Sequence, residues 1–178
     1  LLSLMNTIDA ILTRRSIRSF KPDPIDHGQV LTLLRSAMHA PSAIDEQPWQ
    51  YVVVTDRDKL QAIPTAHTHA GLVAGAPLAI LVCGDMSRLK VDGYWVQDCS
   101  CAAQNILLAA HASGLGAVWV GVYPTTANVT SLSRYFDLPE TVIPFALIAI
   151  GHPAEECGPK DTFDSSLVHW NSWGVASK

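Results

Sequence analysis

The stretch Trp95–Pro124, WVQDCSCAAQNILLAAHASGLGAVWVGVYP, decides the fold of this 178-residue chain. Its first part predicts a helix, because small and apolar residues recur at the i, i+3, i+4 and i+7 positions of one face. These residues are Cys99, Ala102, Ala103, Ile106, Leu107 and Ala110. Gly114 suits the left-handed position that closes a helix. Residues 117–123, β-branched and aromatic, then predict a buried strand. The many small residues of this helix would let the backbone of a neighbouring element approach closely. We therefore interpret the helix as the centre of the core and a candidate dimer contact.

The composition of the chain limits the classes of protein to which it can belong. Hydrophobic residues make up 48% of the chain, enough for a sizeable core in one domain. The net charge of -4 argues against a nucleic-acid binder. Polar and glycine residues interrupt the longest apolar stretch, so no membrane span is expected. Four cysteines without a CxxC pair suggest reduced thiols and a cytoplasmic protein. We expect residues 1–5, too short for a signal peptide, to be disordered or a non-native start before Met5.

The rest of the chain alternates between helical and strand patterns. Asp26 and Gln29 form a capping box that predicts the start of the second helix. Periodicity and turn residues place the other elements. Helices are expected at 7–13, 56–63, 66–75 and 126–136, and strands at 49–55, 78–83, 117–122 and 145–150. This order indicates an α+β fold.

The chain after Gly151 has no helical or strand period, yet it carries Phe163, Val168, Trp170 and Trp173. Solvated tails seldom retain large aromatic residues. We therefore expect residues 151–178 to form an extended arm on a partner subunit.

The segment Arg14, Arg15, Ser16 and Arg18 is the first candidate site. Three guanidinium groups and a hydroxyl directly after a helix could bind a phosphate through charge-assisted hydrogen bonds. The alternative is that the cations only complement the dipole at the helix C-terminus.

Two further segments are candidates for a ligand site. The proline-bounded loop 41–48 offers the side chains of Ser42 and Asp45 to a ligand, unless it is an ordinary connection between a helix and a strand. Gly121, beside Trp119 and Val120, would let a flat ligand approach the backbone. The alternative for Gly121 is a packing role.

The sequence lacks the motifs of several common catalytic and metal-binding sites. His67 and His69 alternate, but without an HExxH pattern or a carboxylate cluster we expect no metal site. The sequence has no GxSxG elbow, Walker loop or GxGxxG fingerprint, which argues against hydrolase, NTPase and Rossmann interpretations.

Five segments taken in order resemble the nitroreductase family of FMN-dependent NAD(P)H oxidoreductases, in a short bacterial-type form. They are RRSIRSF at 14–20, APSAIDEQPWQYVVV at 40–54, the Ala-Pro of 76–77 before LAILVCGD, the stretch from Gln97 to Pro124, and GHPAEECGPKDTFDSSLVHWNSW at 151–173. The resemblance implies a central, mostly antiparallel sheet flanked by helices. It also implies a domain-swapped homodimer, with FMN at the subunit interface and C-terminal arms that cross to the partner.

The resemblance also implies roles for particular residues. The phosphate and the pyrimidine edge of the flavin would be held by Arg14, Arg15, Ser16 and Arg18, with Lys160 returning to the phosphate. The loop Pro41, Ser42, Ala43, Ile44 and Asp45 would reach the flavin from the other subunit. His69 falls near a polar flavin contact, and the isoalloxazine would be lined near N5 by Trp119, Val120 and Gly121.

Two residues depart from the pattern of the family. Asp45 stands where Asn is usual, and its charge would lower the reduction potential of the flavin. Thr162 stands where Arg is frequent, and the loss of one cation would weaken FMN retention unless Arg15 compensates.

The implied reaction passes hydride from NAD(P)H through flavin N5 to a nitroaromatic, quinone or similar acceptor by a ping-pong mechanism. The cofactor supplies the chemistry, so no catalytic side chain is expected. One alternative is a specialised branch of the superfamily, such as flavin fragmentation or reductive dehalogenation, although 178 residues leave little room for an added lid. Another alternative is a non-catalytic flavin carrier or sensor.

Overall fold

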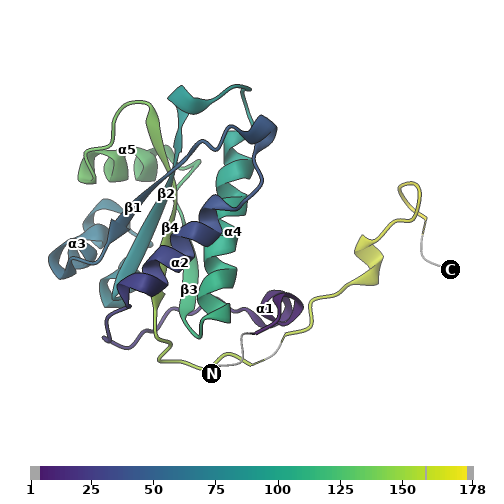
Figure 1. The fold of residues 1–178 in the computed structure, drawn as a ribbon, viewed down its shortest axis with the longest axis horizontal. Coiled ribbons are helices and arrows are strands. Elements are labelled where there is room, and N and C mark those ends of the chain that lie inside the picture. Colours follow the sequence, from purple (N-terminus) through teal and green to yellow (C-terminus); the bar gives the residue numbers. More distant parts are fainter. Residues whose placement is uncertain (1–4, 159, 176–178) are drawn as a thin grey trace.

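The fold is a four-stranded antiparallel sheet with helices on both faces (Figure 1). The computed structural model describes residues 5–158 and 160–175. The strands lie in the order β1-β2-β4-β3, and the sheet is antiparallel throughout. They are β1 (Trp49–Val54), β2 (Leu78–Asp85), β3 (Gly116–Gly121) and β4 (Val142–Gly151). The helices are α1 (Thr7–Thr13), α2 (His27–Met38), α3 (Arg57–Ala66), α4 (Trp95–Ala112) and α5 (Thr126–Tyr135). The α+β class and the antiparallel sheet are as predicted.

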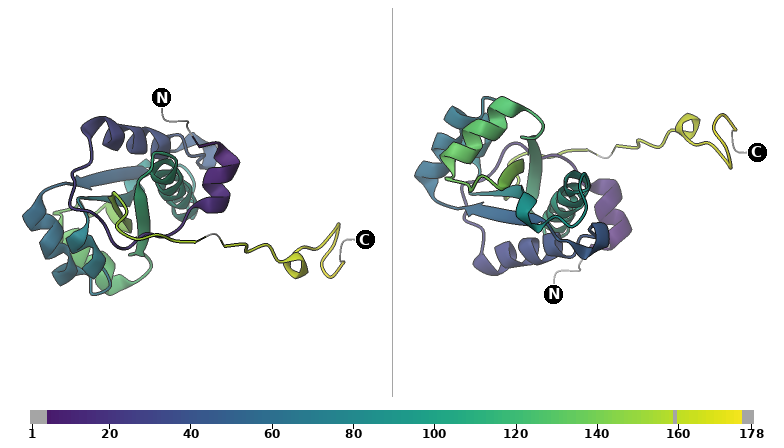
Figure 2. Two further views of the ribbon diagram at one scale, coloured as in Figure 1. Left: turned by 90° about the horizontal axis from the view of Figure 1, so that it is seen from below. Right: turned by 90° about the horizontal axis from the view of Figure 1, so that it is seen from above.

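The sheet separates two cores, because side chains alternate between its faces. Leu78, Ile80 and Val82 of β2 pack with α2 and α4. Ala79 and Leu81 pack on the opposite face with α3 and α5, and Figure 2 shows these two helix layers from either end. A strand covered on both faces reads as a continuous apolar run. The segment LAILVC was therefore recognisable as a strand without any polar alternation.

Local signals predicted several elements well. The capping box is present, with the Asp26 carboxylate accepting from Gly28 N and Gln29 N. All six predicted core residues of α4 are buried. Gly114 adopts the expected left-handed backbone, with φ of 75°.

Two predicted elements need correction. The helix expected at 66–75 is a turn followed by the short 3-10 helix Gly71–Gly75, since a glycine at each end disfavours a longer α-helix. The strand expected to start at Phe145 begins at Val142. Pro144 fits inside β4 because the register shifts between Val82 and Cys83 on β2, and such bulges tolerate proline.

The segment after β4 is extended, as predicted. It first runs beside residues 19–21, where Lys21 N donates to His152 O at 2.8 Å and Ala154 N donates to Ser19 O at 2.9 Å. It then leaves the body of the molecule (Figures 1 and 2). Phe163 and Trp173 on this arm are 79% and 89% exposed.

Some expectations fall outside the described residues. The predicted disordered or non-native start lies mostly on residues 1–4, and the arm prediction includes 159 and 176–178. Within the described part of the chain, no helix is both long and apolar enough to cross a bilayer.

Candidate functional site

A cationic cleft opens where α1 meets the C-terminal arm. Its volume is about 880 Å³. The walls come from the end of α1 with the residues after it, and from the arm: Ile11, Leu12, Thr13, Arg14, Arg15, Ser16, Lys160, Asp161, Thr162 and Phe163. The structure thus brings Lys160 into the same cleft as Arg14 and Ser16, which lie far from it in the sequence. Arg18 does not line the cleft.

The segment 14–18 is fixed against the edge of the sheet. Ser16 bridges to Ala117 on β3, and Ile17 N donates to Ala117 O at 3.1 Å. The buried Ile17 side chain covers Gly116, where an added Cβ would lie 2.7 Å from Ile17 Cβ. Glycine at 116 is therefore what lets the arginine segment come close to β3.

Arg15 connects the cleft to the root of the arm. Its Nε donates to Gly158 O and its Nη2 to Lys160 O, both at 3.2 Å. Its Nη1 donates to Arg14 O at 2.8 Å and Leu12 O at 3.4 Å. Within the described residues the guanidinium of Arg14 makes no hydrogen bond, so Arg14 is the arginine left free to meet an anion.

Glu155 fixes the arm from the other side of the arginine segment. Its Oε1 accepts hydrogen bonds from Arg18 N and from Ser19 N, the latter at 3.0 Å. These backbone hydrogen bonds lower the pKa of the Glu155 carboxyl. Arg18 also donates from Nη1 to Ser16 O at 3.4 Å.

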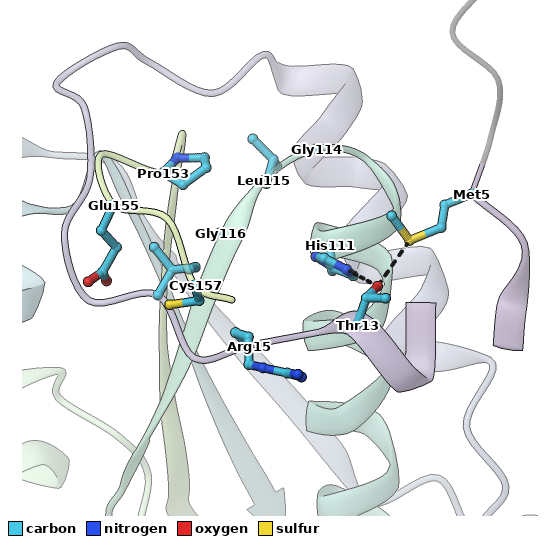
Figure 3. A pocket seen from close by; sticks show the side chains of 11 residues that line it. Met5, Thr13, Arg15, His111, Gly114, Leu115, Gly116, Pro153, Glu155 and Cys157 are labelled. Atoms are coloured by element: carbon cyan, nitrogen blue, oxygen red, sulfur yellow. Dashed lines mark hydrogen bonds between the residues drawn. The ribbon is translucent and has the colours of Figure 1, made fainter. Parts of the chain in front are cut away.

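A smaller pocket of about 280 Å³ adjoins the cleft and shares Thr13 and Arg15 with it (Figure 3). The Thr13 hydroxyl donates to Asp9 O at 2.6 Å, so the His111 Nε2, 2.8 Å away, donates its hydrogen to Thr13 Oγ1. Burial, with Arg14 and Arg15 nearby, lowers the pKa of His111. Together these features favour a neutral imidazole.

The predicted flavin loop lies at the opposite end of α4. Ala43 N donates to Asp98 Oδ1 at 3.1 Å, and Asp98 is in the first turn of α4 whereas His111 is in the last. At a rise of 1.5 Å per residue, these two ends are about 20 Å apart. Figure 1 shows the loop between α2 and β1 at one end of α4 and α1 at the other. One chain therefore does not bring Pro41, Ser42, Ala43, Ile44 and Asp45 to the cationic cleft.

The loop 41–48 has an unusual backbone. Ile44, Asp45 and Gln47 have φ of 41°, 54° and 48°, a region that non-glycine residues rarely occupy. Asp45 is exposed, and its Oδ1 accepts from Gln47 Nε2 at 2.8 Å. A strained, well-anchored loop is typical of functional sites.

The third predicted group lies on the edge strand β3, beyond the point where Ser16 joins it. The ring of Trp119 packs edge-on against Phe145, with 5.4 Å between centroids, and Val120 is buried on the other face. Gly121 is exposed, and an added Cβ would meet no atom within 4 Å. A packing role for Gly121 is therefore wrong within the described chain, and the space beside it is open to a ligand.

The two alternating histidines form a link to that strand. His67 is buried, and its Nε2 donates to Gly121 O at 2.8 Å. Its Nδ1 accepts from His69 N at 3.2 Å, and His69 itself is exposed. Among the described residues no group of three or more His, Cys, Asp or Glu could hold a metal ion.

The sequence patterns did not reveal the two buried acids, Glu46 and Asp98, or the role of Glu155 in fixing the arm. Asp98 could have been noticed, because it lies one turn before Ala102 on the buried face of α4. Nothing local marks Glu46 or Glu155, whose partners are distant in the sequence.

The fold and site together define an α+β protein with a cationic cleft at the root of an extended arm. The family model for the nitroreductase family matches residues 11–85 and 65–152. A protein of Methanothermobacter thermautotrophicus named "Putative NADH dehydrogenase/NAD(P)H nitroreductase" is 48% identical over 171 residues, 96% of this chain and 90% of the relative. The chain belongs to the nitroreductase family, as its motifs predicted.

Solved structures agree with this assignment. A crystal structure of a protein of the same name from Bacteroides thetaiotaomicron is 40% identical, with a TM-score of 0.89 over 94% of this chain and 98% of the other. An FMN-dependent nitroreductase from Clostridium difficile is 28% identical, with a TM-score of 0.86 over 93% of this chain and 99% of the other.

Proposed function

We propose that this protein is an NAD(P)H-dependent FMN oxidoreductase that passes reducing equivalents to a nitroaromatic, quinone or similar acceptor by a ping-pong mechanism. The observation that carries the proposal is the cationic cleft. Arg14, Ser16 and Lys160 converge there from two distant segments, with a volume and a charge suited to a phosphate and the chain attached to it. The names of the relatives, NAD(P)H nitroreductase and FMN-dependent nitroreductase, support the same class of reaction and the same cofactor.

The residues present fit FMN. Arg14, Ser16, Arg18 and Lys160 would hold the phosphate and the pyrimidine edge, with Arg15 beside them. The open space at Gly121, next to Trp119 and Val120, would take the flat ring, with His69 as a polar neighbour. When bound, FMN supplies two-electron chemistry at N5, accepting hydride from the nicotinamide and releasing it to the acceptor.

The chain's own part is binding and orientation. Arg14 meets the phosphate as a charge-assisted donor. Arg15 holds the arm that delivers Lys160 by donating to Gly158 O and Lys160 O, while its contacts with Leu12 O and Arg14 O fix the guanidinium to its own segment. Thr162 lines the cleft where an arginine is frequent in the family. We therefore expect Thr162→Arg to tighten FMN binding.

A complete site requires two subunits in this proposal. The cleft and the loop 41–45 lie at opposite ends of α4, so the loop of one subunit would complete the cleft of the other. The exposed apolar residues of α1 and of the arm support a homodimer in which the arms cross. They include Ile8, Ile11, Leu12, Phe163, Leu167, Trp170 and Trp173. The cytoplasmic location expected from the sequence stays a prediction.

The direct test is an anaerobic absorbance titration of the purified protein with NADH and then NADPH. Flavin bands that bleach, and then recover on addition of a quinone, are the expected result. Bands that persist would instead support the carrier or sensor alternative. Failure to bind added FMN would overturn the assignment of the cleft. Parallel lines in double-reciprocal plots at several acceptor concentrations would support the ping-pong mechanism.

A further inference from the structure

Two buried carboxyl groups lie next to each other beneath the loop 41–48. Glu46, from the loop, is 3% exposed, and Asp98, from the first turn of α4, is 5% exposed. Each has one satisfied oxygen. Glu46 Oε2 accepts from Lys90 N at 2.8 Å and from Val91 N at 3.1 Å, and Asp98 Oδ1 accepts from Ala43 N at 3.1 Å.

The other oxygen of each carboxyl group has no such donor. Within the described residues, Glu46 Oε1 and Asp98 Oδ2 are both buried and without a hydrogen-bond donor. A hydrogen bond with the Glu46 side chain is nevertheless among the causes that raise the pKa of Asp98. Two ionised carboxylates offer acceptors alone, so they cannot satisfy this contact. A single proton between them satisfies both oxygens and removes one buried charge.

The charged groups around the pair do not neutralise it. Lys90 Nζ donates to the backbone oxygens of Asp45 at 3.2 Å and Ile44 at 3.5 Å, and Arg88 Nε donates to Gln47 O at 3.0 Å. On the loop, the Asp45 carboxylate is occupied by Gln47 Nε2. Cys99 on α4 is a further titratable neighbour of Asp98, and burial raises the pKa of its thiol, so it stays uncharged.

The backbone conformation of the loop 41–48 needs support from the contacts of Glu46 and Asp98. Three of its residues occupy the left-handed backbone region, and a β-branched residue such as Ile44 is strongly disfavoured there. Such a conformation persists when surrounding contacts enforce it. The backbone contacts of Asp98 and Glu46 fasten the loop to α4 at Ala43 and to residues 90–91 at Glu46, on either side of Ile44 and Asp45.

We propose that Glu46 and Asp98 share one proton at neutral pH, and that this hydrogen-bonded pair positions the loop 41–48 for its contact with the flavin. The flavin contact rests on the proposed function, whereas the shared proton does not. Burial, together with the charge of Glu46, raises the pKa of Asp98, with the hydrogen bond from Ala43 N opposing the rise. Loss of the proton in alkaline solution would place two negative charges side by side and loosen the loop.

The proton itself is tested by infrared spectroscopy of the FMN-free protein. The wild-type protein should keep the carbonyl stretching band of a protonated carboxylic acid at neutral pH. Asp98→Asn and Glu46→Gln should each abolish it, because the remaining acid then ionises against an amide donor. Glu140→Gln, at an exposed carboxylate, should leave the band in place. Absence of the band from the wild-type protein, or its survival in both variants, would overturn the proposal.

The positioning role is tested by comparing two substitutions of Asp98. The side chain introduced by Asp98→Asn can still accept from Ala43 N and can donate to Glu46 at every pH, whereas the methyl group left by Asp98→Ala can do neither. We expect Asp98→Asn to keep the FMN dissociation constant within about twofold. Asp98→Ala should raise it about tenfold, as expected for an unsupported polar contact. Equal weakening by both variants would show that the hydrogen bond does not position the loop.

The pH dependence gives a third readout. The folded state holds the shared proton above the ordinary Asp pKa of about 4, where the unfolded chain has released it. The free energy of unfolding should therefore decline as pH rises from that value until the pair ionises. Urea unfolding at a series of pH values should show the decline in the wild-type protein and lose it in Asp98→Asn, and a decline of the same size in both would contradict the proposal.

These outcomes separate the two proposals. A wild-type protein that binds no FMN would overturn the proposed function. The infrared and urea measurements use no flavin, and they would still decide whether the proton is shared.

Discussion

The two ends of α4 carry groups of opposite character. At its C-terminal end the structure places an open cleft lined by Arg14, Arg15 and Lys160. At its N-terminal end lies the strained loop 41–48, where the carboxyl groups of Glu46 and Asp98 are buried. A ligand with a phosphate at one side and a neutral ring at the other suits both environments, but a single chain holds them about 20 Å apart. The comparison therefore supports the proposal that each site is assembled from two subunits.

The largest effect is expected from a substitution on β3 that would displace the arginine segment lining the cleft. Gly116→Val would push a side chain into Ile17, whose Cβ and Cγ2 lie 2.7 Å from an added Cβ. We expect a loss of about 1–3 kcal/mol in the free energy of unfolding and the loss of FMN binding. Urea unfolding and flavin fluorescence measure the two effects.

Gly121→Ala is the matched control on the same strand. An added Cβ meets no atom within 4 Å there, so stability should be unchanged or slightly higher while FMN binding weakens. A stability loss as large as that of Gly116→Val would contradict the open space that we describe at Gly121.

The next largest effect is expected from Arg14→Gln. A charged hydrogen bond contributes about 1.5–3 kcal/mol, so the FMN dissociation constant should rise roughly 10- to 100-fold. Isothermal titration calorimetry with FMN and with riboflavin should show that the penalty is confined to the phosphate-bearing ligand. The exposed Arg134→Gln should change neither constant. Equal penalties for riboflavin and FMN at Arg14→Gln would place the phosphate elsewhere.

The loop end should respond with a change in redox potential rather than in affinity. In the proposed site the exposed Asp45 carboxylate would oppose the negative charge of the reduced flavin, so Asp45→Asn should raise the midpoint potential by about 10–20 mV, from an interaction of roughly 0.5–1 kcal/mol. Spectroelectrochemical titration of the flavin measures the shift. An unchanged potential would mean that Asp45 does not face the ring.

The smallest effect concerns His111 in the pocket of Figure 3. Burial and the arginines lower the pKa of this histidine. As pH falls below about 6.5, the unfolded chain therefore takes up the proton before the folded chain does, and stability declines. His111→Gln can still donate to Thr13, and its unfolding curve should lose this acid-side slope. Parallel pH profiles for the two proteins would exclude His111 as its source.

The parts of this fold that depend on local contacts could be predicted from the sequence. The buried face of α4, the Asp26 capping box and the Gly114 terminus follow from contacts within a few residues, and all three are present. The start of β4 could not be predicted, because an irregularity in the pairing of β4 with β2 decides whether Pro144 fits inside the strand.

The same distinction holds for the site. Arg14, Ser16 and Lys160 were identified through motifs, and they meet in one cleft. The contacts of Arg15 with Gly158 O and Lys160 O and the burial of Glu46 and Asp98 depend on segments distant in the sequence. No local pattern encodes them.

The central claim is that each flavin site combines the cleft of one subunit with the loop of the other. Mixed dimers of Arg14→Gln and Pro41→Trp chains test it most directly. The two variants are unfolded and refolded together, and the FMN bound per dimer is measured at a concentration at which neither variant alone binds FMN. If the subunits share sites, each mixed dimer regains one intact site, and FMN binding with NAD(P)H-dependent bleaching returns. If cleft and loop of one chain serve the same flavin, every site keeps one defect and no binding returns, which would contradict the account.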